Sequence, residues 1–177
     1  MPGGLEESPM PALLNDPDDF CRKNQKRQGS TPVAGFERLG ALSASQTGEL
    51  HWTVEGKTGS TGHPRLDLTV SGQVSLTCQR CMEAFPFELT SRAFIILVRT
   101  EADADIIEAS LAADDPVEVI AFDESVDLMV LIEDEALLAL PLSPRHEVCP
   151  GATPLEFGAK RESPFAVLKD LKLEKEK

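Results

Sequence analysis

Two runs of alternating apolar residues meet at a Cys-x-x-Cys pair in the segment VSLTCQRCMEAFPF, residues 74–87. The apolar positions are Val74, Leu76 and Cys78 before the pair, and Phe85, Phe87 and Leu89 after it. A period of two is typical of half-buried strands, and a short turn between two such strands makes them antiparallel. The pattern therefore predicts an antiparallel hairpin with Cys78 and Cys81 at its corner.

Further segments predict additional strands of the same sheet. Leu50, Trp52 and Val54 alternate with polar residues, as do Leu66, Leu68 and Val70. Gly72-Gln73 has the composition of a tight hairpin turn. Apolar runs at 94–98 and 117–122 predict two more strands. We expect an antiparallel meander of about five or six strands, open or closed into a barrel-like form.

Helix signals occur at three places. Asn15-Asp16-Pro17 predicts the start of a short helix that runs to about Gln28. A longer apolar helix is predicted from about Ser125 or Asp127 to Leu140, where Pro141 ends it. Ser163-Pro164 predicts a short C-terminal helix. The fold class is therefore α+β, with one main helix packed on the sheet and short helices near both ends.

The length of 177 residues suits one domain with tails. Residues 1–14 are predicted to be a disordered lead-in, 15–173 a single α+β domain, and 174–177 a charged tail. Within the domain, residues 100–116 are predicted to form an acidic mobile loop or a marginal helix. Neither a signal peptide nor a membrane-spanning run is evident, so we expect a cytoplasmic location.

Charge is distributed unevenly along the chain. Residues 100–144 contain thirteen carboxylates and no Lys or Arg, whereas the rest of the chain has 17 acidic and 17 basic side chains. This acidic segment therefore accounts for the whole net charge of -13. Its field repels phosphate backbones and attracts cationic partners. An ordinary solvated surface is the alternative interpretation.

Four residues have the spacing of a metal site. Cys78-x-x-Cys81 offers two thiolates in a turn, and His146-x-x-Cys149 offers an imidazole and a third thiolate about 64 residues later. Together they predict one structural zinc ion that joins the sheet to the loop after the main helix. Alternatively, the cysteines are small apolar residues and His146 is a surface residue. A thioredoxin-like redox pair is a further reading of the motif, although that motif belongs at the start of a helix.

Catalytic motifs are absent from the sequence. It contains no Gly-rich phosphate loop, nucleophile elbow or metalloprotease motif. Glu133, Asp134 and Glu135 are adjacent, which spreads them around a helix instead of pairing two carboxylates for acid-base work. We therefore expect no enzymatic activity, with a zinc-dependent hydrolase as the remaining enzymatic alternative.

Several separated motifs carry a family resemblance. The runs SLTCQRCMEAFPFEL, DLMVLIEDEALLALPLSPRHEVC and SPFAVLKDLK, with NDP and QKR near the front, resemble the YceD family of large ribosomal RNA subunit accumulation proteins. The similarity extends from about Leu13 to Lys172. It implies a cytosolic, non-enzymatic ribosome-biogenesis factor that large-subunit ribosomal RNA needs in order to accumulate. The segment 131–141, LIEDEALLALP, is the most characteristic part of the resemblance, and cysteines near Cys78, Cys81 and Cys149 occur in many family members.

The charge pattern suggests two ways in which such a factor can act. In the favoured one, the acidic surface and the main helix bind a basic ribosomal protein of the large subunit or a pre-ribosomal particle. The partner-binding residues predicted for this role are Glu133, Asp134, Glu135, Leu131 and Leu138. In the alternative, a basic N-terminal helix contacts ribosomal RNA or its precursor directly. The nucleic-acid residues predicted for that role are Arg22, Lys23, Lys26 and Arg27.

Overall fold

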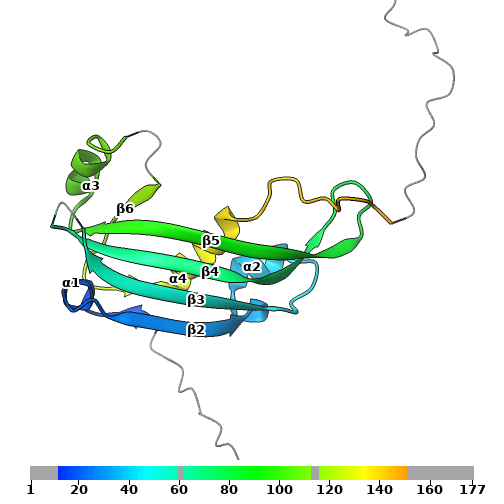
Figure 1. The fold of residues 1–177 in the computed structure, drawn as a ribbon, viewed down its shortest axis with the longest axis horizontal. Coiled ribbons are helices and arrows are strands. Elements are labelled where there is room, and N and C mark those ends of the chain that lie inside the picture. Colours follow the sequence, from blue (N-terminus) through cyan, green and yellow to red (C-terminus); the bar gives the residue numbers. More distant parts are fainter. Residues whose placement is uncertain (1–11, 60–61, 113–115, 151–177) are drawn as a thin grey trace, which may run out of the picture. The chain divides into compact units, whose positions relative to one another are not determined.

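A five-stranded sheet in the order β2-β3-β4-β5-β6 dominates the computed structural model, which describes residues 12–59, 62–112 and 116–150 (Figure 1). Strands β2 to β5 follow one another and pair antiparallel, whereas β6 pairs with β5 in parallel. The sheet is open, with β2 and β6 at its edges. A second, two-stranded ladder joins β1 to β7. The α+β class and the open form of the expected sheet are thereby confirmed.

The elements follow the chain in a fixed order. They are β1 (Leu13–Leu14), α1 (Pro17–Arg22), β2 (Lys26–Pro32), the 3-10 helix η1 (Val33–Gly35), α2 (Glu37–Leu42), β3 (Glu49–Thr58), β4 (Pro64–Thr77), β5 (Ala84–Val98), α3 (Glu101–Glu108), β6 (Val117–Ala121), β7 (Val126–Asp127) and α4 (Leu128–Leu138). None of the helices in the described ranges has the length and apolar content that crossing a membrane requires.

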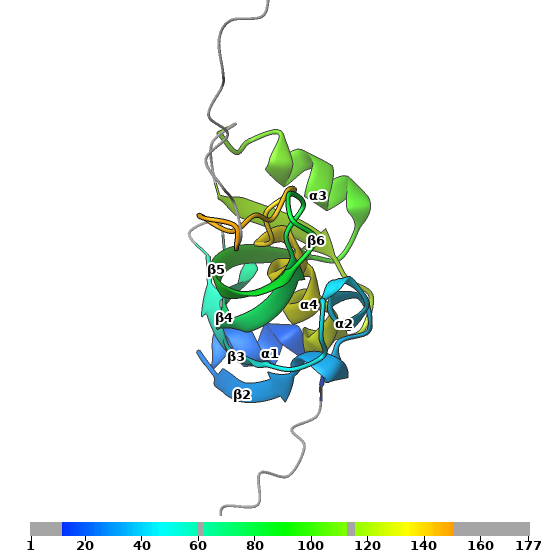
Figure 2. The same cartoon turned by 90° about the vertical axis from the view of Figure 1, so that its right-hand side faces the viewer.

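The two faces of the sheet differ in what covers them. Leu66, Leu68 and Val70 on β4 point into the main core, which the buried residues of α1, α2 and α4 complete. Figure 2 shows α2 and α4 together on this side of the sheet. On β5, Ile96 and Val98 alternate with the core residues and instead form a small second cluster with α3 and β6. Most of the other side chains on the second faces of β3 and β4 are polar.

The main helix α4 confirms the prediction made from its apolar pattern. Asp127 caps it by accepting a hydrogen bond from the Met129 N–H at 2.8 Å. Leu128, Ile132 and Ala136 recur at helical spacing and are at most 1% exposed. The helix therefore packs on the main core through these three residues. The predicted helix that begins at Ser163 lies outside the described residues, as do residues 1–11 of the predicted lead-in 1–14. At the end of that lead-in, Leu13 and Leu14 form β1, and Leu14 is 2% exposed in the main core.

The basic N-terminal helix is shorter than predicted. It ends at Arg22, and Asn24 turns the chain with a φ of 49°. Lys26 then begins a strand that pairs with β3 over seven residues. Gly29 fits this pairing because it lies against Trp52, where a Cβ would approach the indole ring to 2.6 Å. The extension of the helix to Gln28 was therefore wrong, because strand pairing outweighs the local helix signal.

The predicted turn at Gly72-Gln73 was also wrong. Both residues lie inside the continuous strand β4, where Gly72 pairs with Leu50 on one side and Leu89 on the other. A Cβ on Gly72 would lie 2.2 Å from the Glu49 carbonyl oxygen. The glycine thus permits a close backbone approach between strands and does not make a turn.

The strand predicted at 117–122 is present, but it breaks the meander. Helix α3 occupies part of the acidic stretch that was predicted as a mobile loop or marginal helix, and Thr100 caps it. The chain then returns so that Val117 pairs with Phe94 in the same direction as β5. A helix between two parallel strands is the connection that such a pairing requires. The extension of the single domain to residue 173 stays a prediction.

Candidate functional site

The Cys-x-x-Cys corner is a tight turn between β4 and β5, as predicted. The Cys78 N–H donates to the Glu83 carbonyl at 2.9 Å, and the Met82 N–H donates back to the Cys78 carbonyl at 2.9 Å. Met82 has a φ of 63°, which lets the chain reverse within four residues. Because the motif connects two antiparallel strands and does not start a helix, its setting differs from that of a thioredoxin-like pair.

The loop after α4 brings His146 to this turn. The Gln79 N–H donates to the Pro144 carbonyl at 2.8 Å, and the Arg80 guanidinium donates to the His146 carbonyl at 3.3 Å. The His146 ring rests on Phe85 of β5 with 4.7 Å between ring centroids. Its Nδ1 atom then lies 3.4 Å from the Cys81 sulfur. Backbone and aromatic contacts therefore position the imidazole beside the thiols.

The Cys78 thiol is prepared for ionisation. Its side chain is buried, which opposes the charged form, but N–H groups of Cys81, His146 and Arg80 surround the sulfur. The His146 ring adds to their effect, and together they lower the pKa of Cys78 to about 5. A thiolate is the form of cysteine that binds metal ions. Near neutral pH this residue is therefore already in its metal-binding form.

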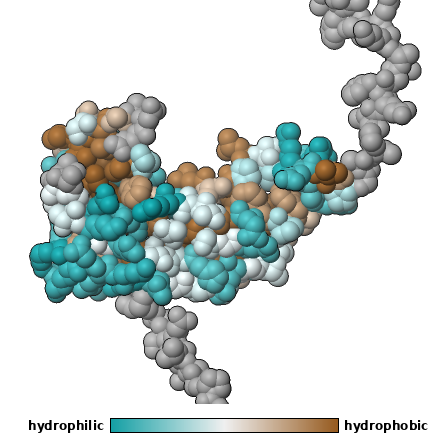
Figure 3. Space-filling view, in the orientation of Figure 1, coloured by the Kyte–Doolittle hydropathy of each residue, from teal (hydrophilic) through white to brown (hydrophobic). Residues whose placement is uncertain are grey.

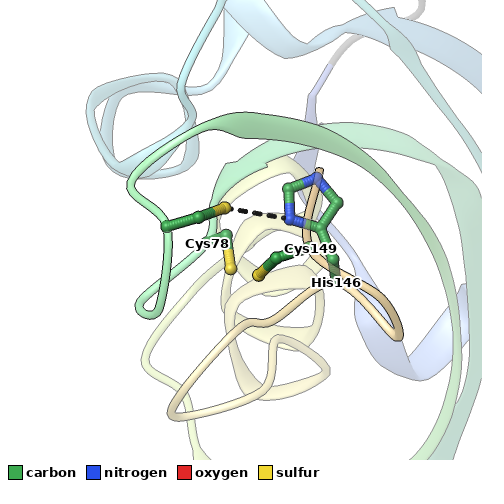
Figure 4. Close-up of side chains that lie close together, drawn as sticks. Cys78, His146 and Cys149 are labelled. Carbon is green, nitrogen blue, oxygen red and sulfur yellow. Dashed lines mark hydrogen bonds between the residues drawn. The ribbon is translucent and has the colours of Figure 1, made fainter. Parts of the chain in front are cut away.

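Four side chains at this corner form a cluster that could hold a metal ion. The ligand atoms of Cys78, Cys81, His146 and Cys149 all lie within 4.8 Å of one another, and Figure 4 shows Cys78, His146 and Cys149 converging. Three thiolates and one imidazole are a donor set that zinc accepts in tetrahedral geometry. Four protein donors complete that geometry and leave no position for a substrate or a reactive water. The set therefore fits a structural metal ion better than a catalytic one.

The carboxylates predicted to bind a partner all have partners within the chain. Glu133, which is 8% exposed, accepts hydrogen bonds from the backbone N–H groups of Arg38 and Leu39 at 2.7 and 3.0 Å. Asp134 pairs with the Arg38 guanidinium at 2.6 Å, and Glu135, also 8% exposed, accepts a hydrogen bond from the Ser91 hydroxyl. Two of these three carboxylates thus hold α4 in place.

The two leucines of the same predicted set differ from each other. Leu131 is half-buried and packs against the main core, whereas Leu138 at the end of α4 is 71% exposed.

The pKa of Glu133 is lowered. Burial opposes its ionisation, but the hydrogen bonds that it accepts from Leu39 and Arg38 have the larger effect. The helix therefore presents Leu138 outward, while Glu133 remains charged against α2.

The four basic residues predicted to contact RNA are divided between two elements. Arg22 and Lys23 lie at the end of α1, where both pair with Asp19. Lys26 and Arg27 are neighbours on β2, so they point to opposite faces of the sheet. Lys26 pairs with Glu55 at 3.1 Å, and the Arg27 guanidinium lies over the Phe20 ring. The single basic helix that was predicted is therefore absent from the described residues.

A cluster that the sequence did not reveal surrounds Asp67 on β4. Asp67 is 5% exposed and has the Lys57 ammonium at 2.6 Å, the Arg65 guanidinium at 2.8 Å and the Arg92 guanidinium at 3.8 Å. These residues lie on three strands and become neighbours only through the register, in which Lys57 pairs with Arg65. In the sequence, the only indication of this cluster is an acidic residue, Asp67, between two apolar residues, Leu66 and Leu68.

The comparisons with known proteins agree on one family. The model of the family "Large ribosomal RNA subunit accumulation protein YceD" matches residues 66–172. A protein of Haemophilus influenzae (strain ATCC 51907 / DSM 11121 / KW20 / Rd) that carries the same name is 38% identical over 109 residues. The aligned region covers 56% of this chain and 60% of the relative. No solved structure gives a significant match.

Proposed function

The chain belongs to the YceD family, and on that premise we propose that it is a non-enzymatic ribosome-biogenesis factor that supports accumulation of large-subunit ribosomal RNA. The observation that carries the proposal is the family match over residues 66–172, which includes the Cys-x-x-Cys corner and the whole of α4. The closed donor set at that corner supports a role without catalysis, because a catalytic zinc keeps one position open. The proposed site of action is the cytoplasm.

The proposed cofactor is one structural zinc ion. Cys78, Cys81, His146 and Cys149 would hold it, and the ion would supply a cross-link between the β4–β5 turn and the loop after α4. The backbone contacts from Gln79 to Pro144 already bring these segments together. The metal would therefore stabilise a contact between these two segments that their backbone hydrogen bond already makes.

The proposed partner is a basic ribosomal protein of the large subunit, either free or in a pre-ribosomal particle. The acidic segment 100–144 holds the entire charge excess of the chain. Its exposed carboxylates in the described ranges are Glu101, Asp103, Asp105, Glu108, Glu118, Asp123, Glu124 and Asp127. Such a surface attracts and screens a cationic protein before that protein meets RNA.

Within this surface, α4 contributes an apolar contact. Leu138 is exposed, and the side chain of Asp134 is 44% exposed beside Arg38. Leu131, Glu133 and Glu135 support these two from within, because they pack or hydrogen-bond inside the chain. The proposed interface therefore uses Leu138 for its apolar contact, and Asp134 together with the carboxylates of α3 for its acidic contacts.

The role in RNA accumulation is tested in cells that lack the gene for this chain. We expect the ratio of large-subunit to small-subunit ribosomal RNA to fall, and the gene supplied from a plasmid to restore it. An unchanged ratio under several growth rates would refute the proposed role. The large-subunit proteins that accumulate unassembled in these cells are then the candidates for the partner.

The acidic surface is tested by binding each purified candidate protein to the purified chain. Glu101→Gln, Asp105→Asn and Glu108→Gln together remove three charges from α3. We expect roughly tenfold or greater loss of affinity, and weaker binding at high salt. The matched control combines Glu49→Gln, Glu83→Gln and Glu147→Gln, which removes the same charge from exposed positions outside the acidic segment. Equal losses in both variants would refute a specific role for α3.

A further inference from the structure

The face of the sheet opposite the main core is largely uncovered. Helices α1, α2 and α4 pack on the other face, and α3 covers only the end of β5 beside β6. In Figure 1 the uncovered face of β2 to β4 is toward the viewer, with α4 and α2 behind the sheet. A shallow depression of about 330 Å³ lies on it, lined chiefly by Gln28, Ser30, His51, Thr53, Thr69 and Ser71. Every one of these side chains can donate or accept a hydrogen bond.

Next to this depression stands the Asp67 cluster. One nearly buried carboxylate there faces Lys57, Arg65 and Arg92. Figure 3 shows hydrophilic residues gathered at the end of the sheet where β3 turns into β4. The Arg65 Nε and Asp67 Oδ1 atoms are buried and form no aligned hydrogen bond, although they are 2.8 Å apart. Lys57 also lies 3.5 Å from Glu55, which pairs with Lys26 at 3.1 Å. Four cations and two carboxylates therefore leave an excess of positive charge at this place.

An aromatic ring extends the cluster. The Arg65 and Arg92 guanidinium groups lie 5.3 and 4.7 Å from the centre of the Phe94 ring. Phe94 and Arg92 are two residues apart on β5, so both point to the uncovered face. Guanidinium planes and aromatic rings are the groups on which unpaired bases stack. The cluster therefore combines groups that suit phosphates with groups that suit bases.

This positive site is exceptional in a chain with a net charge of -13. Outside the acidic segment 100–144 the chain has equal numbers of acidic and basic residues, but here the basic groups prevail. We propose that the uncovered sheet face binds a single strand of RNA, with Lys57 and Arg92 at the phosphates and the hydroxyl and amide side chains of the depression at the bases and 2′-hydroxyls. The choice of RNA as the polyanion rests on the proposed role in ribosomal RNA accumulation.

Single-stranded RNA fits this face better than a duplex does. The depression is lined by short polar side chains of the strands, so the edges of bases must be unpaired to reach them. Two of the cations can contact phosphates without leaving Asp67 uncompensated, because Arg65 remains at 2.8 Å. The acidic segment and this face would then serve different partners, one cationic and one anionic.

The test measures binding of a labelled single-stranded oligoribonucleotide of about 20 nucleotides to the full chain at several salt concentrations. The variant Lys57→Gln with Arg92→Gln keeps Arg65 beside Asp67. We expect its dissociation constant to rise by roughly tenfold or more, and the slope of log affinity against log salt to fall by about 1.4, as for two lost phosphate contacts on a single strand. Circular dichroism and the urea midpoint establish that the variant is folded.

The matched control is Lys175→Gln with Lys177→Gln, which removes the same charge from positions outside the uncovered face. We expect it to bind within roughly twofold of the unaltered chain. A chain that does not bind the oligoribonucleotide at physiological salt, equal losses in the two variants, or equal binding of duplex and single strand would each overturn the inference. An altered RNA ratio in cells lacking the gene would still uphold the proposed function in those cases. Conversely, if the chain binds the oligoribonucleotide but its loss does not change the cellular RNA ratio, the RNA-binding face is supported and the proposed function is refuted.

Discussion

The Glu133 carboxylate of α4 accepts a hydrogen bond from the Leu39 N–H of α2 at 3.0 Å, across 94 positions of sequence. The same oxygen accepts from the Arg38 N–H at 2.7 Å, while the Arg38 guanidinium binds the other carboxylate oxygen. Helix α2 begins at Glu37 and has no side-chain cap from its own N-terminal residue Phe36. Glu133 therefore acts as a cap supplied by a distant helix, and it joins α2 to α4.

Replacing this carboxylate should weaken the fold. Glu133→Gln retains the size of the side chain but removes the charge that faces two N–H groups and a guanidinium. We expect the free energy of unfolding to fall by about 1–3 kcal/mol, measured by urea titration at pH 7. Asp134→Asn is the matched control, since its more exposed pair with Arg38 should contribute less than about 1 kcal/mol. Equal effects of the two substitutions would contradict the capping role.

The lowered pKa of Glu133 predicts a pH dependence with a definite sign. In the unfolded chain the carboxyl titrates near its ordinary value of 4.5, whereas in the folded chain its pKa lies lower. Between those two values the unfolded state binds more protons, so stability from this residue is complete above pH 4.5 and declines as the pH falls through the folded-state value. The difference in unfolding free energy between the unaltered chain and Glu133→Gln should therefore shrink on acidification. A constant difference from pH 3 to pH 7 would contradict this.

Gly72 offers a test of the register between β3 and β4. A Cβ at this position would lie 2.2 Å from the Glu49 carbonyl oxygen and 2.9 Å from the Leu50 side chain, so the strands must separate to admit it. We expect Gly72→Ala to lower the urea midpoint by an amount equivalent to about 1–3 kcal/mol. Ser71→Ala, on the same strand but facing the uncovered side, should change stability by less than about 0.5 kcal/mol. A neutral Gly72→Ala would show that the strands are not so closely paired.

The metal centre predicts one zinc ion per chain by elemental analysis of protein purified without chelator. Cys81→Ser should reduce the bound zinc, whereas Cys21→Ser should not, because Cys21 lies apart from the cluster that could hold the ion, with its thiol directed at the Arg65 carbonyl. Removing the ion should also lower stability, by roughly 3 kcal/mol at zinc a hundred times above its dissociation constant. Zinc well below one equivalent, with unfolding unchanged by Cys81→Ser, would rule out a structural ion.

Much of the sheet and the main helix could be predicted because their signals are local. The period of two along β3, β4 and β5 reflects one face in the core and one outside, and α4 repeats Leu128, Ile132 and Ala136 at helical spacing. The cluster that could hold a metal ion was found for a similar reason, because two cysteines in a turn have little apolar core to fill. The strands, the main helix and each of the two ligand pairs, Cys78 with Cys81 and His146 with Cys149, can be recognised from a short stretch of sequence.

The remaining features depend on contacts between distant segments. Lys26 follows a helix signal but pairs with Glu55 across the sheet, and Gly72 looks like a turn residue until Glu49 is placed beside it. The ion pairs of Asp67 can be recognised only when the strand register places Lys57 and Arg92 beside it. Adjacent acidic residues in a sequence likewise give no sign of which one is buried. Such relationships require the strand order and the packing partner, and neither is encoded locally.

The contact between Cys81 and His146 spans 65 positions of the chain, which has a consequence for synthesis. At the usual rate of translation, roughly 3 to 13 s pass between the appearance of the cysteine turn and that of the histidine. During this interval the β4–β5 hairpin can form from neighbouring segments, but His146 and Cys149 have not yet been synthesised to join Cys78 and Cys81. We expect the newly made protein to be most sensitive to thiol oxidation in that interval, and to become resistant once the loop after α4 has emerged.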